Sequence, residues 1–335
     1  MGLPTSIKKF PLGFGGGGLS INNELIKNSP KEMTSIGLLH HAFEKGFRLF
    51  DTAPFYGSGT SEICIGEAFK HIRDKVFIIS KSGVVWDQNK IYTKTNDPKI
   101  TEKMLHQSLK NLNTDYIDLY MVHWPDKNID IRLTLEVYAD ALEKGVIRHI
   151  GLCNTNKDDL KKAQEVVKID AVQSEFNLLN RKPFTDIQNF LRENDISFIS
   201  WGTLDKGILA GQFNRNDKSK VWWKRMDVLE KIEKIENIHP YLLKKYKINK
   251  AQLKWTKKIL KKMRKLKKIQ PLLEKYQITE LQLALAHNLA GNEPTISLCG
   301  ISNKEQLNQL VDSLDNIPSK EVIYQALSIL DSKGL

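Results

Sequence analysis

A unit made of a short apolar run, a polar residue at its end and a helical segment recurs between residues 50 and 126 of this chain. The apolar runs lie in the segments FDTAPFYG (50–57), FIISKSG (77–83) and LYMVHWPD (119–126). Runs of this length, bounded by Gly, Pro and polar residues, are typical of buried strands. Residues 61–72 and 100–112 carry apolar residues at helical spacing. The repeated order predicts an α/β fold, a (β/α)8 TIM barrel whose active site lies at the C-terminal ends of the strands.

Four polar residues lie at or just beyond these strand ends: Asp51, Tyr56, Lys81 and His123. A phenol has an ordinary pKa near ~10 and is a weak acid at neutral pH. A neighbouring lysine ammonium favours the phenolate, so we expect Lys81 to lower the pKa of Tyr56. Asp51 can keep Lys81 charged, and His123 can hydrogen-bond a carbonyl oxygen while Tyr56 protonates it. This set suits carbonyl reduction by a hydride, which an organic cofactor supplies.

Several long motifs in the same order resemble the aldo-keto reductase family. DTAPFYGSGTSEICIGEAF resembles the Asp/Tyr signature of that family, and LKNLNTDYIDLYMVHWPD resembles its signature ending in histidine. VIRHIGLCNTNKDDL, VQSEFNLLNR and WGTLDKGILAGQF resemble its fifth, sixth and seventh strand regions. The resemblance covers nearly the whole chain and implies an NAD(P)-dependent oxidoreductase. It makes Tyr56 the general acid/base, tuned by Lys81 and Asp51, with His123 orienting the carbonyl.

The resemblance also implies a set of binding residues. Asn154 and Gln173 match positions that bind the nicotinamide carboxamide, and Trp201 matches an aromatic stacked on the nicotinamide. The remaining cofactor positions are those of the pyrophosphate loop, Thr203, Leu204, Gly207 and Leu209, and those of the adenosine end, Gly300, Ser302 and Gln306. We expect Phe55, Trp86 and Trp124 to contact the substrate.

The adenosine end departs from the family pattern. Ser302 stands where the family usually has a basic residue on the 2′-phosphate, and Leu310 stands where an asparagine usually contacts adenine. Cys153 replaces a serine that usually precedes the asparagine of the carboxamide site. The chain therefore has the pattern of an NADP or NAD site, with the choice between the two cofactors open.

The rest of the chain fits a single domain over residues 1–335, longer than the ~250 residues typical of a barrel. Further strands are predicted at 11–15, 147–153, 170–176, 197–201 and 295–300, with helices near 31–45, 132–144, 157–167, 184–194 and 319–331. Gly13, Gly15 and Gly18 match the dinucleotide fingerprint G-x-G-x-x-G, but polar residues follow where that motif requires a helix. We therefore interpret the glycines as a loop beside the site.

Composition indicates a cytoplasmic protein. No run of 18 apolar residues predicts a membrane span, and the N-terminal residues lack a signal-peptide apolar region. The three cysteines are widely spaced in apolar settings, which is typical of reduced core thiols. No Cys/His cluster has metal-ligand spacing, so we expect no metal.

Residues 214–270 hold 20 Lys and Arg but only 5 Asp and Glu, whereas the whole chain carries a net charge of +12. This stretch predicts a helical insertion between strands seven and eight, with apolar stripes at Val228, Ile232 and Ile235 and at Ile259, Met263 and Leu266. Its lysines can simply face water, or they can attract anions. The second case predicts an anionic or sugar-derived substrate. Two other functions stay open: a cofactor-binding regulatory subunit with little turnover, and nucleic-acid or acidic-partner binding through the insertion, for which no recognition motif is present.

Overall fold

The computed structural model describes residues 3, 4, 7, 9–20, 35–86, 92–211, 250–290 and 295–332. The chain divides into two compact units, one of residues 1–203 and 288–312 and the other of residues 204–287 and 313–335. Whether the chain is one domain over 1–335 stays a prediction.

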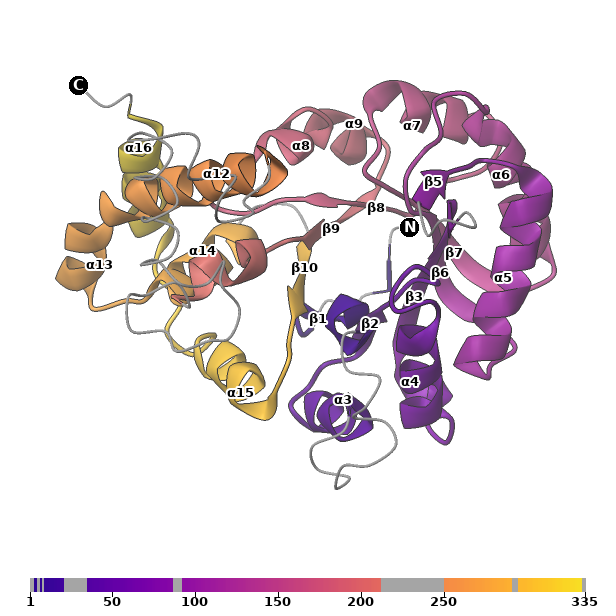
Figure 1. The fold of residues 1–335 in the computed structure, drawn as a ribbon, viewed down its shortest axis with the longest axis horizontal. Helices are drawn as coiled ribbons and strands as arrows, with labels where there is room; N and C mark the ends of the chain where they lie inside the picture. Colours follow the sequence, from indigo (N-terminus) through magenta and orange to yellow (C-terminus); the bar gives the residue numbers. More distant parts are fainter. Residues whose placement is uncertain are drawn as a thin grey trace. The chain divides into compact units, whose positions relative to one another are not determined.

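The first unit is built on a closed barrel of parallel strands (Figure 1). The strands, in chain order, are β1 (Leu12–Gly15), β2 (Leu49–Asp51), β3 (Phe77–Ser82), β6 (Ile117–Val122), β7 (Ile147–Cys153), β8 (Ala171–Glu175), β9 (Ser197–Trp201) and β10 (Thr295–Gly300). Around the barrel they follow in sequence order, and β10 pairs with β1 to close it. The predicted TIM barrel is confirmed. Because parallel strands all point the same way, the residues at their C-terminal ends converge on one rim.

Helices lie on the outside of the barrel, most of them in the connections between successive strands and the last of them after the final strand (Figure 1). They are α3 (Ser35–Glu44), α4 (Thr60–Phe69), α5 (Pro98–Leu112), α6 (Ile131–Glu143), α7 (Lys157–Gln164), α8 (Lys182–Thr185), α9 (Gln188–Glu193) and α15 (Lys304–Asp312). Local sequence fixes several helix starts: the side chain of Asp97 accepts from the Ile100 amide, and Pro98 occupies the first turn of α5. The single helix predicted near 184–194 is wrong in detail, because α8 and α9 are separate short helices.

The barrel interior is a packed core. Many of its side chains are branched aliphatic residues from the strands, including Leu49, Ile79, Leu119, Ile199 and Ile296. All three cysteines are buried and unpaired, as predicted for core thiols. The glycine-rich segment after β1 forms a short 3-10 helix, η1 (Gly16–Ser20), and the described residues 9–20 contain no α-helix.

A two-stranded hairpin that the sequence did not predict follows β3. It consists of β4 (Val84–Trp86) and β5 (Tyr92–Lys94), which pair antiparallel. Gly83, with φ of 90°, turns the chain from β3 into the hairpin.

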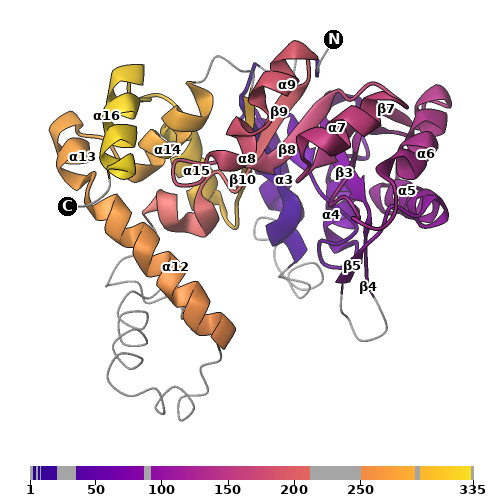
Figure 2. The same ribbon diagram turned by 90° about the horizontal axis from the view of Figure 1, so that it is seen from above.

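The described part of the second unit is helical (Figure 2). It comprises η4 (Asp205–Ala210), α12 (Lys250–Lys267), α13 (Gln270–Tyr276), most of α14 (Glu280–Leu289) and α16 (Lys320–Asp331). Of the predicted insertion 214–270, only 250–270 lie within the described residues, so the stripe at Val228, Ile232 and Ile235 lies outside them.

Helix α12 has the amphipathic character that the sequence predicted. Ile259 and Leu266 are buried, whereas Lys257, Lys258 and Lys261 are exposed. The helix therefore packs by its apolar stripe and presents most of its lysines to water.

Candidate active site

The four residues singled out in the sequence meet at the C-terminal rim of the barrel. Asp51 is the last residue of β2, Lys81 lies in β3, and His123 directly follows β6. Tyr56 lies in the turn between β2 and α4, where its amide donates to the Ala53 carbonyl at 2.9 Å. The amide of His123 donates to the Ser82 carbonyl at 2.9 Å and so extends the strand pairing by one residue.

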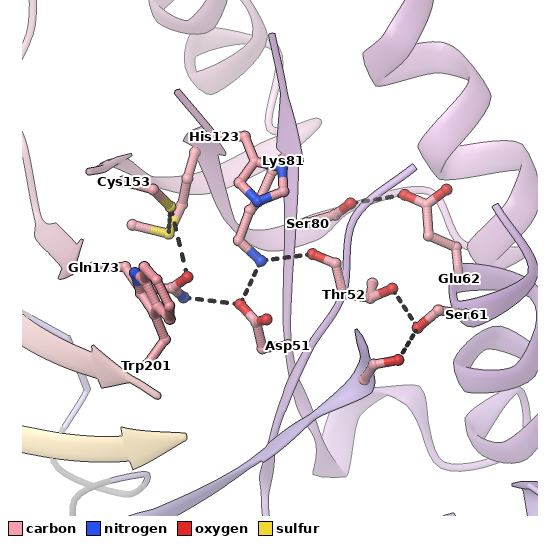
Figure 3. Close-up of polar contacts among 12 residues, drawn as sticks. Asp51, Thr52, Ser61, Glu62, Ser80, Lys81, His123, Cys153, Gln173 and Trp201 are labelled. Carbon is pink, nitrogen blue, oxygen red and sulfur yellow. Dashed lines mark hydrogen bonds and ion pairs between the residues drawn. The ribbon is translucent and has the colours of Figure 1, made fainter. Parts of the chain in front are cut away.

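Lys81 and Asp51 form a buried ion pair in the barrel (Figure 3). The Lys81 ammonium lies 2.6 Å from Oδ1 of Asp51 and donates to the Thr52 carbonyl at 2.8 Å. The Lys81 side chain is 0% exposed and that of Asp51 is 4% exposed. Burial by itself disfavours the ammonium, but the Asp51 carboxylate, together with smaller contributions from Tyr56 and Cys153, outweighs burial, so the pKa of Lys81 is raised. Lys81 is therefore a permanent cation.

The Tyr56 ring lies against this cation and against His123. Its centroid is 5.2 Å from Nζ of Lys81 and 5.7 Å from the His123 ring, which meets it edge-on. Burial raises the pKa of Tyr56 to about 12, and the Lys81 ammonium offsets only part of that rise. The expectation that the lysine leaves Tyr56 with a lowered pKa is therefore wrong, because desolvation of the phenolate costs more than the cation returns.

His123 is kept neutral. Burial lowers its pKa well below the ordinary value of a histidine, and the nearby Lys81 ammonium lowers it further. A neutral imidazole carries one N–H donor and one acceptor nitrogen, so His123 can donate a hydrogen bond without carrying charge. At neutral pH the rim thus presents a protonated phenol, a neutral imidazole and a buried ammonium.

A pocket of about 270 Å³ opens over these residues. Tyr56, His123 and Asp51 line it together with Trp124, Asn154, Gln173, Trp201, Gly202 and Leu298, and with the glycines Gly15, Gly17, Gly18 and Gly300. The pocket is therefore polar on the side of Tyr56 and bare backbone on the side of the glycines.

The amide residues predicted for the carboxamide are hydrogen-bonded within the pocket wall. Asn154 donates from Nδ2 to the His123 carbonyl at 3.0 Å, and its Oδ1 accepts from the Trp201 indole at 3.0 Å. Gln173 donates from Nε2 to Oδ1 of Asp51 at 2.8 Å, and its Oε1 accepts from the Cys153 thiol at 3.6 Å (Figure 3). Asn154, Gln173 and Trp201 thus lie together with the Asp51–Lys81 pair.

The remaining cofactor positions fall into two groups. In the first unit, Gly300 lines the pocket, and the Thr203 hydroxyl donates to the Leu298 carbonyl at 2.9 Å. Ser302 is exposed at the start of α15, where its amide donates to Oε1 of Gln306 at 3.0 Å. Leu310, in the usual place of the adenine-contacting asparagine, is buried in the core and presents no polar group.

The second group lies in the second unit and consists of Leu204, which directly precedes η4, and of Gly207 and Leu209 within η4. The amides of Gly207 and Leu209 both donate to the Leu204 carbonyl, at 2.9 and 3.2 Å. Asp205, Lys206 and Gly207 have φ of 45°, 58° and 92°, which is unusual for two non-glycine residues in succession. The carboxylate of Asp205 forms an ion pair with Lys262 of α12. The segment is a tight left-handed turn tied to that helix.

Of the three predicted substrate residues, Trp124 lines the pocket, whereas Phe55 and Trp86 do not. Phe55 nevertheless packs edge-on against the rings of Tyr56 and His123, with centroids 6.4 and 6.2 Å away. Trp86 stacks on Phe55 at 4.7 Å with an interplanar angle of 11°. The two residues therefore extend the pocket edge outward instead of forming its wall.

Sequence reasoning missed three features of this region. Gln173 contacts Asp51 although 122 positions separate them, and no local pattern signals that. Tyr92 and Lys94 of the hairpin lie beside Trp86 and Trp124. Glu62 is fully buried behind the barrel wall, where it accepts from Ser80 and Asn111, and burial raises its pKa.

Comparisons with known proteins identify the family. Residues 11–330 match the model of the aldo/keto reductase family. Aldo-keto reductase YhdN of Bacillus subtilis is 36% identical over 183 residues, which are 54% of this chain and 55% of that protein. The NADH-specific methylglyoxal reductase of Escherichia coli is 28% identical over 319 residues, 90% of this chain and 87% of that protein.

Solved structures share the fold. The glycerol dehydrogenase AKR11B4 from Gluconobacter oxydans superposes with a TM-score of 0.74 at 22% identity, covering 96% of this chain and 91% of that one. The chain belongs to the aldo/keto reductase family and is an NAD(P)-dependent oxidoreductase of carbonyl substrates. The predicted resemblance is confirmed. Within the described residues, no helix has both the length and the apolar character needed to cross a bilayer.

Proposed function

We propose that the chain reduces an aldehyde or ketone to the alcohol, and catalyses the reverse reaction, with Tyr56 as general acid and general base. One observation carries the proposal: Tyr56 and His123 line one pocket directly over a buried Lys81–Asp51 ion pair.

The protonation states support reduction at neutral pH. A phenol with a pKa of about 12 remains protonated, so Tyr56 has its proton available when negative charge develops on the carbonyl oxygen. The Lys81 ammonium stabilises the phenolate left behind, and Asp51 holds that ammonium in place. His123 donates its N–H to the same oxygen and orients the carbonyl.

The bare backbone on one side of the pocket fits a nicotinamide cofactor. A Cβ added at Gly300 meets nothing within 4 Å, and one at Gly17 or Gly18 approaches other atoms no closer than 3.9 Å. Side chains at these positions would project into open space of the pocket, so their absence leaves room for a flat ligand. A reduced nicotinamide held by these residues would supply the hydride for the carbonyl carbon.

We assign Asn154 and Gln173 to the carboxamide of that cofactor and Trp201 to the face of its ring. Both amides line the pocket, and the indole of Trp201 fixes the orientation of the Asn154 amide. The flat Trp201 ring would set which face of the nicotinamide meets the carbonyl. Thr203, Leu204, Gly207 and Leu209 follow β9 directly in sequence, and we assign them to the pyrophosphate.

Ser302 governs the choice between NADPH and NADH in this proposal. The Ser302 hydroxyl stands where the family usually has a basic residue. Each charge-assisted hydrogen bond that such a residue would make to the 2′-phosphate is worth roughly 1.5–3 kcal/mol. We therefore expect little preference for NADPH, in keeping with the NADH-specific name of the Escherichia coli relative. Fluorescence titration of both cofactors tests this, and Ser302→Arg should tighten NADPH at least tenfold while leaving NADH unchanged. A strong NADPH preference in the unmodified protein would contradict the assignment.

The substrate is proposed to carry negative charge. Residues 214–270 concentrate the positive charge of the chain, and the connection after strand seven lies on the catalytic side of a barrel. Exposed charge raises the local concentration of anions over a range of ~8 Å in physiological salt. Replacing Lys261, Lys265 and Lys268 with Gln, with Lys262 kept as the partner of Asp205, should lower kcat/KM for anionic carbonyls selectively at low salt. Equal values for neutral and anionic substrates throughout would contradict this part of the proposal.

Substitution of Tyr56 tests the proposed function most directly. Tyr56→Phe should lower kcat at least ~10²-fold, the usual contribution of a general acid, with the cofactor Kd nearly unchanged. Tyr324→Phe, at a tyrosine that is 67% exposed on α16, is the matched control and should behave like the unmodified protein. Near-normal turnover by Tyr56→Phe across a panel of aldehydes and sugars would overturn the assignment. Absence of turnover in the unmodified protein would instead favour a cofactor-binding regulatory role.

A further inference from the structure

The hairpin β4–β5 carries two aromatic rings and one cation on a single face. Its register places Trp86 opposite Tyr92 and Val84 opposite Lys94. Residues directly opposite each other in an antiparallel pair point to the same side, and alternate residues of a strand share a side. Trp86, Tyr92 and Lys94 therefore project from the same face, whereas Val85 and Thr93 project from the other.

That face is turned toward the catalytic pocket. Trp86 and Tyr92 both contact the ring of Phe55, at 4.7 and 5.6 Å, and Phe55 in turn touches the rings of Tyr56 and His123. Lys94 places its ammonium 4.5 Å from the ring centre of Trp124, which lines the pocket. The hairpin thus continues the pocket outward as a wall of rings with one positive charge.

The rings and the charge are open to a ligand. Trp86 is 44% exposed and Tyr92 is 58% exposed, a large exposure for aromatic side chains that contact each other. Among the residues that the structure describes, no carboxylate lies within ion-pair distance of Lys94, whose ammonium is held instead by the Trp124 ring. A cation fixed on an aromatic surface without an acidic partner attracts an anion that arrives with an apolar body.

We propose that this face binds the distal end of the substrate, and that the substrate is a carbonyl compound whose carboxylate is separated from the carbonyl by a flat apolar spacer. The carbonyl lies at Tyr56 and His123, the spacer lies along the rings of Trp124 and Trp86, and Lys94 donates to the carboxylate. The inference rests on the proposed carbonyl reduction. It assigns the direct contact with the substrate anion to Lys94, whereas the lysines of 214–270 are proposed to act only through long-range attraction.

A pair of aldehydes of equal size tests the subsite: 4-formylbenzoate, which is anionic, and 4-formylbenzamide, which is neutral. Lys94→Met should lower kcat/KM for 4-formylbenzoate about tenfold, the weight of one charge-assisted hydrogen bond, and change that for 4-formylbenzamide less than twofold. Lys99→Met, at an exposed lysine of α5, is the matched control and should leave both values unchanged. A third aldehyde, 4-formylphenyl phosphate, shows whether the cation prefers carboxylate or phosphate; a larger loss for the phosphate would reject the carboxylate assignment.

Binding can be measured apart from turnover. The Kd of 4-(hydroxymethyl)benzoate, measured by quenching of tryptophan fluorescence, should rise about tenfold in Lys94→Met and stay unchanged in Lys99→Met. An unchanged preference for 4-formylbenzoate in Lys94→Met, together with unchanged quenching, would overturn the subsite and leave the proposed reduction standing. Failure to reduce either aldehyde, with quenching that still depends on Lys94, would instead contradict the proposed reduction and support the anion subsite.

Discussion

Replacing Lys81 by methionine removes the cation of the buried pair and should lower both the stability and the turnover of the protein. The Lys81 ammonium is fully buried, 2.6 Å from Asp51 and 2.8 Å from the Thr52 carbonyl. Breaking a buried ion pair by removing one partner typically costs 3–5 kcal/mol, because the other charge stays buried. Asp51 keeps one donor, Gln173 at 2.8 Å, so we expect a loss near the lower end, about 3 kcal/mol.

Turnover should fall for a different reason. Without Lys81 the pKa of Tyr56 rises further above about 12, since the ammonium is what opposes the effect of burial. The proton donor becomes weaker and the phenolate loses its counter-ion. We expect kcat to fall at least ~10²-fold, which corresponds to about 2.7 kcal/mol of transition-state stabilisation.

A double variant distinguishes the two effects. In Asp51→Asn/Lys81→Met no buried charge is left unpaired, so most of the stability should return while kcat stays low. Urea denaturation gives the free energy of unfolding, and kcat is measured at saturating cofactor. Lys75→Met, at an exposed lysine of η3 (Arg73–Lys75), is the matched control. Near-normal kcat in Lys81→Met, or a double variant no more stable than the single one, would refute the reasoning.

Three other outcomes follow from the electrostatics of the described residues. The rate of carbonyl reduction should not change between pH 6 and 9 through ionisation of Tyr56, because a pKa of about 12 keeps the phenol protonated. Alcohol oxidation needs the phenolate, so its rate should rise about tenfold per pH unit over that range. A bell-shaped pH–rate profile centred near neutrality in both directions would contradict this. Burial lowers the pKa of His123 in the folded state, so below about pH 6.5 only the unfolded chain takes up this proton, and the free energy of unfolding should fall by about 1.4 kcal/mol per pH unit from this group. His123→Gln should therefore show a shallower decline between pH 6.5 and 5, and an unchanged slope would count against the neutral assignment. Lys262→Met should lower the free energy of unfolding by about 2–3 kcal/mol, because the Asp205 carboxylate, which is 8% exposed, loses its partner. Lys261→Met, at an exposed lysine, should change the free energy of unfolding by less than about 0.5 kcal/mol. Equal effects of the two substitutions in denaturant titrations would contradict the ion pair.

The sequence was enough to predict the barrel, because local patterns report local structure. Short apolar runs alternate with helical periodicity from Leu49 to Trp201, and parallel strands joined by helices have few alternative arrangements. The polar residues at the strand ends predicted the position of the candidate site for the same reason. The C-terminal ends of all strands of a parallel barrel meet at one rim, so Asp51, Lys81 and His123 lie together whatever the positions of their strands in the barrel.

The helix boundaries and the hairpin were less accessible to sequence reasoning. Residues 184–194 have helical spacing, but the chain breaks between α8 and α9, which a periodicity of this length does not resolve. The strands β4 and β5 are only three residues each, too short for an alternating pattern to stand out from a loop. The pairing of Trp86 with Tyr92, and with it the face that carries Lys94, becomes visible only once the register is known.

Residue types and their order along the chain by themselves determined the fold, the family and the four residues of the candidate site. Only the tertiary structure decided their electrostatic state and their neighbours. The sequence gives Tyr56 a lysine that lowers its pKa, yet the folded protein raises it to about 12, because desolvation depends on how completely distant segments exclude water. In the same way, Gln173 reaches Asp51 across 122 positions of sequence only because β8 and β2 face each other inside a closed barrel. Chemistry that depends on water exclusion and on contacts between distant strands is a property of the packed molecule, since no short segment of the chain contains both partners.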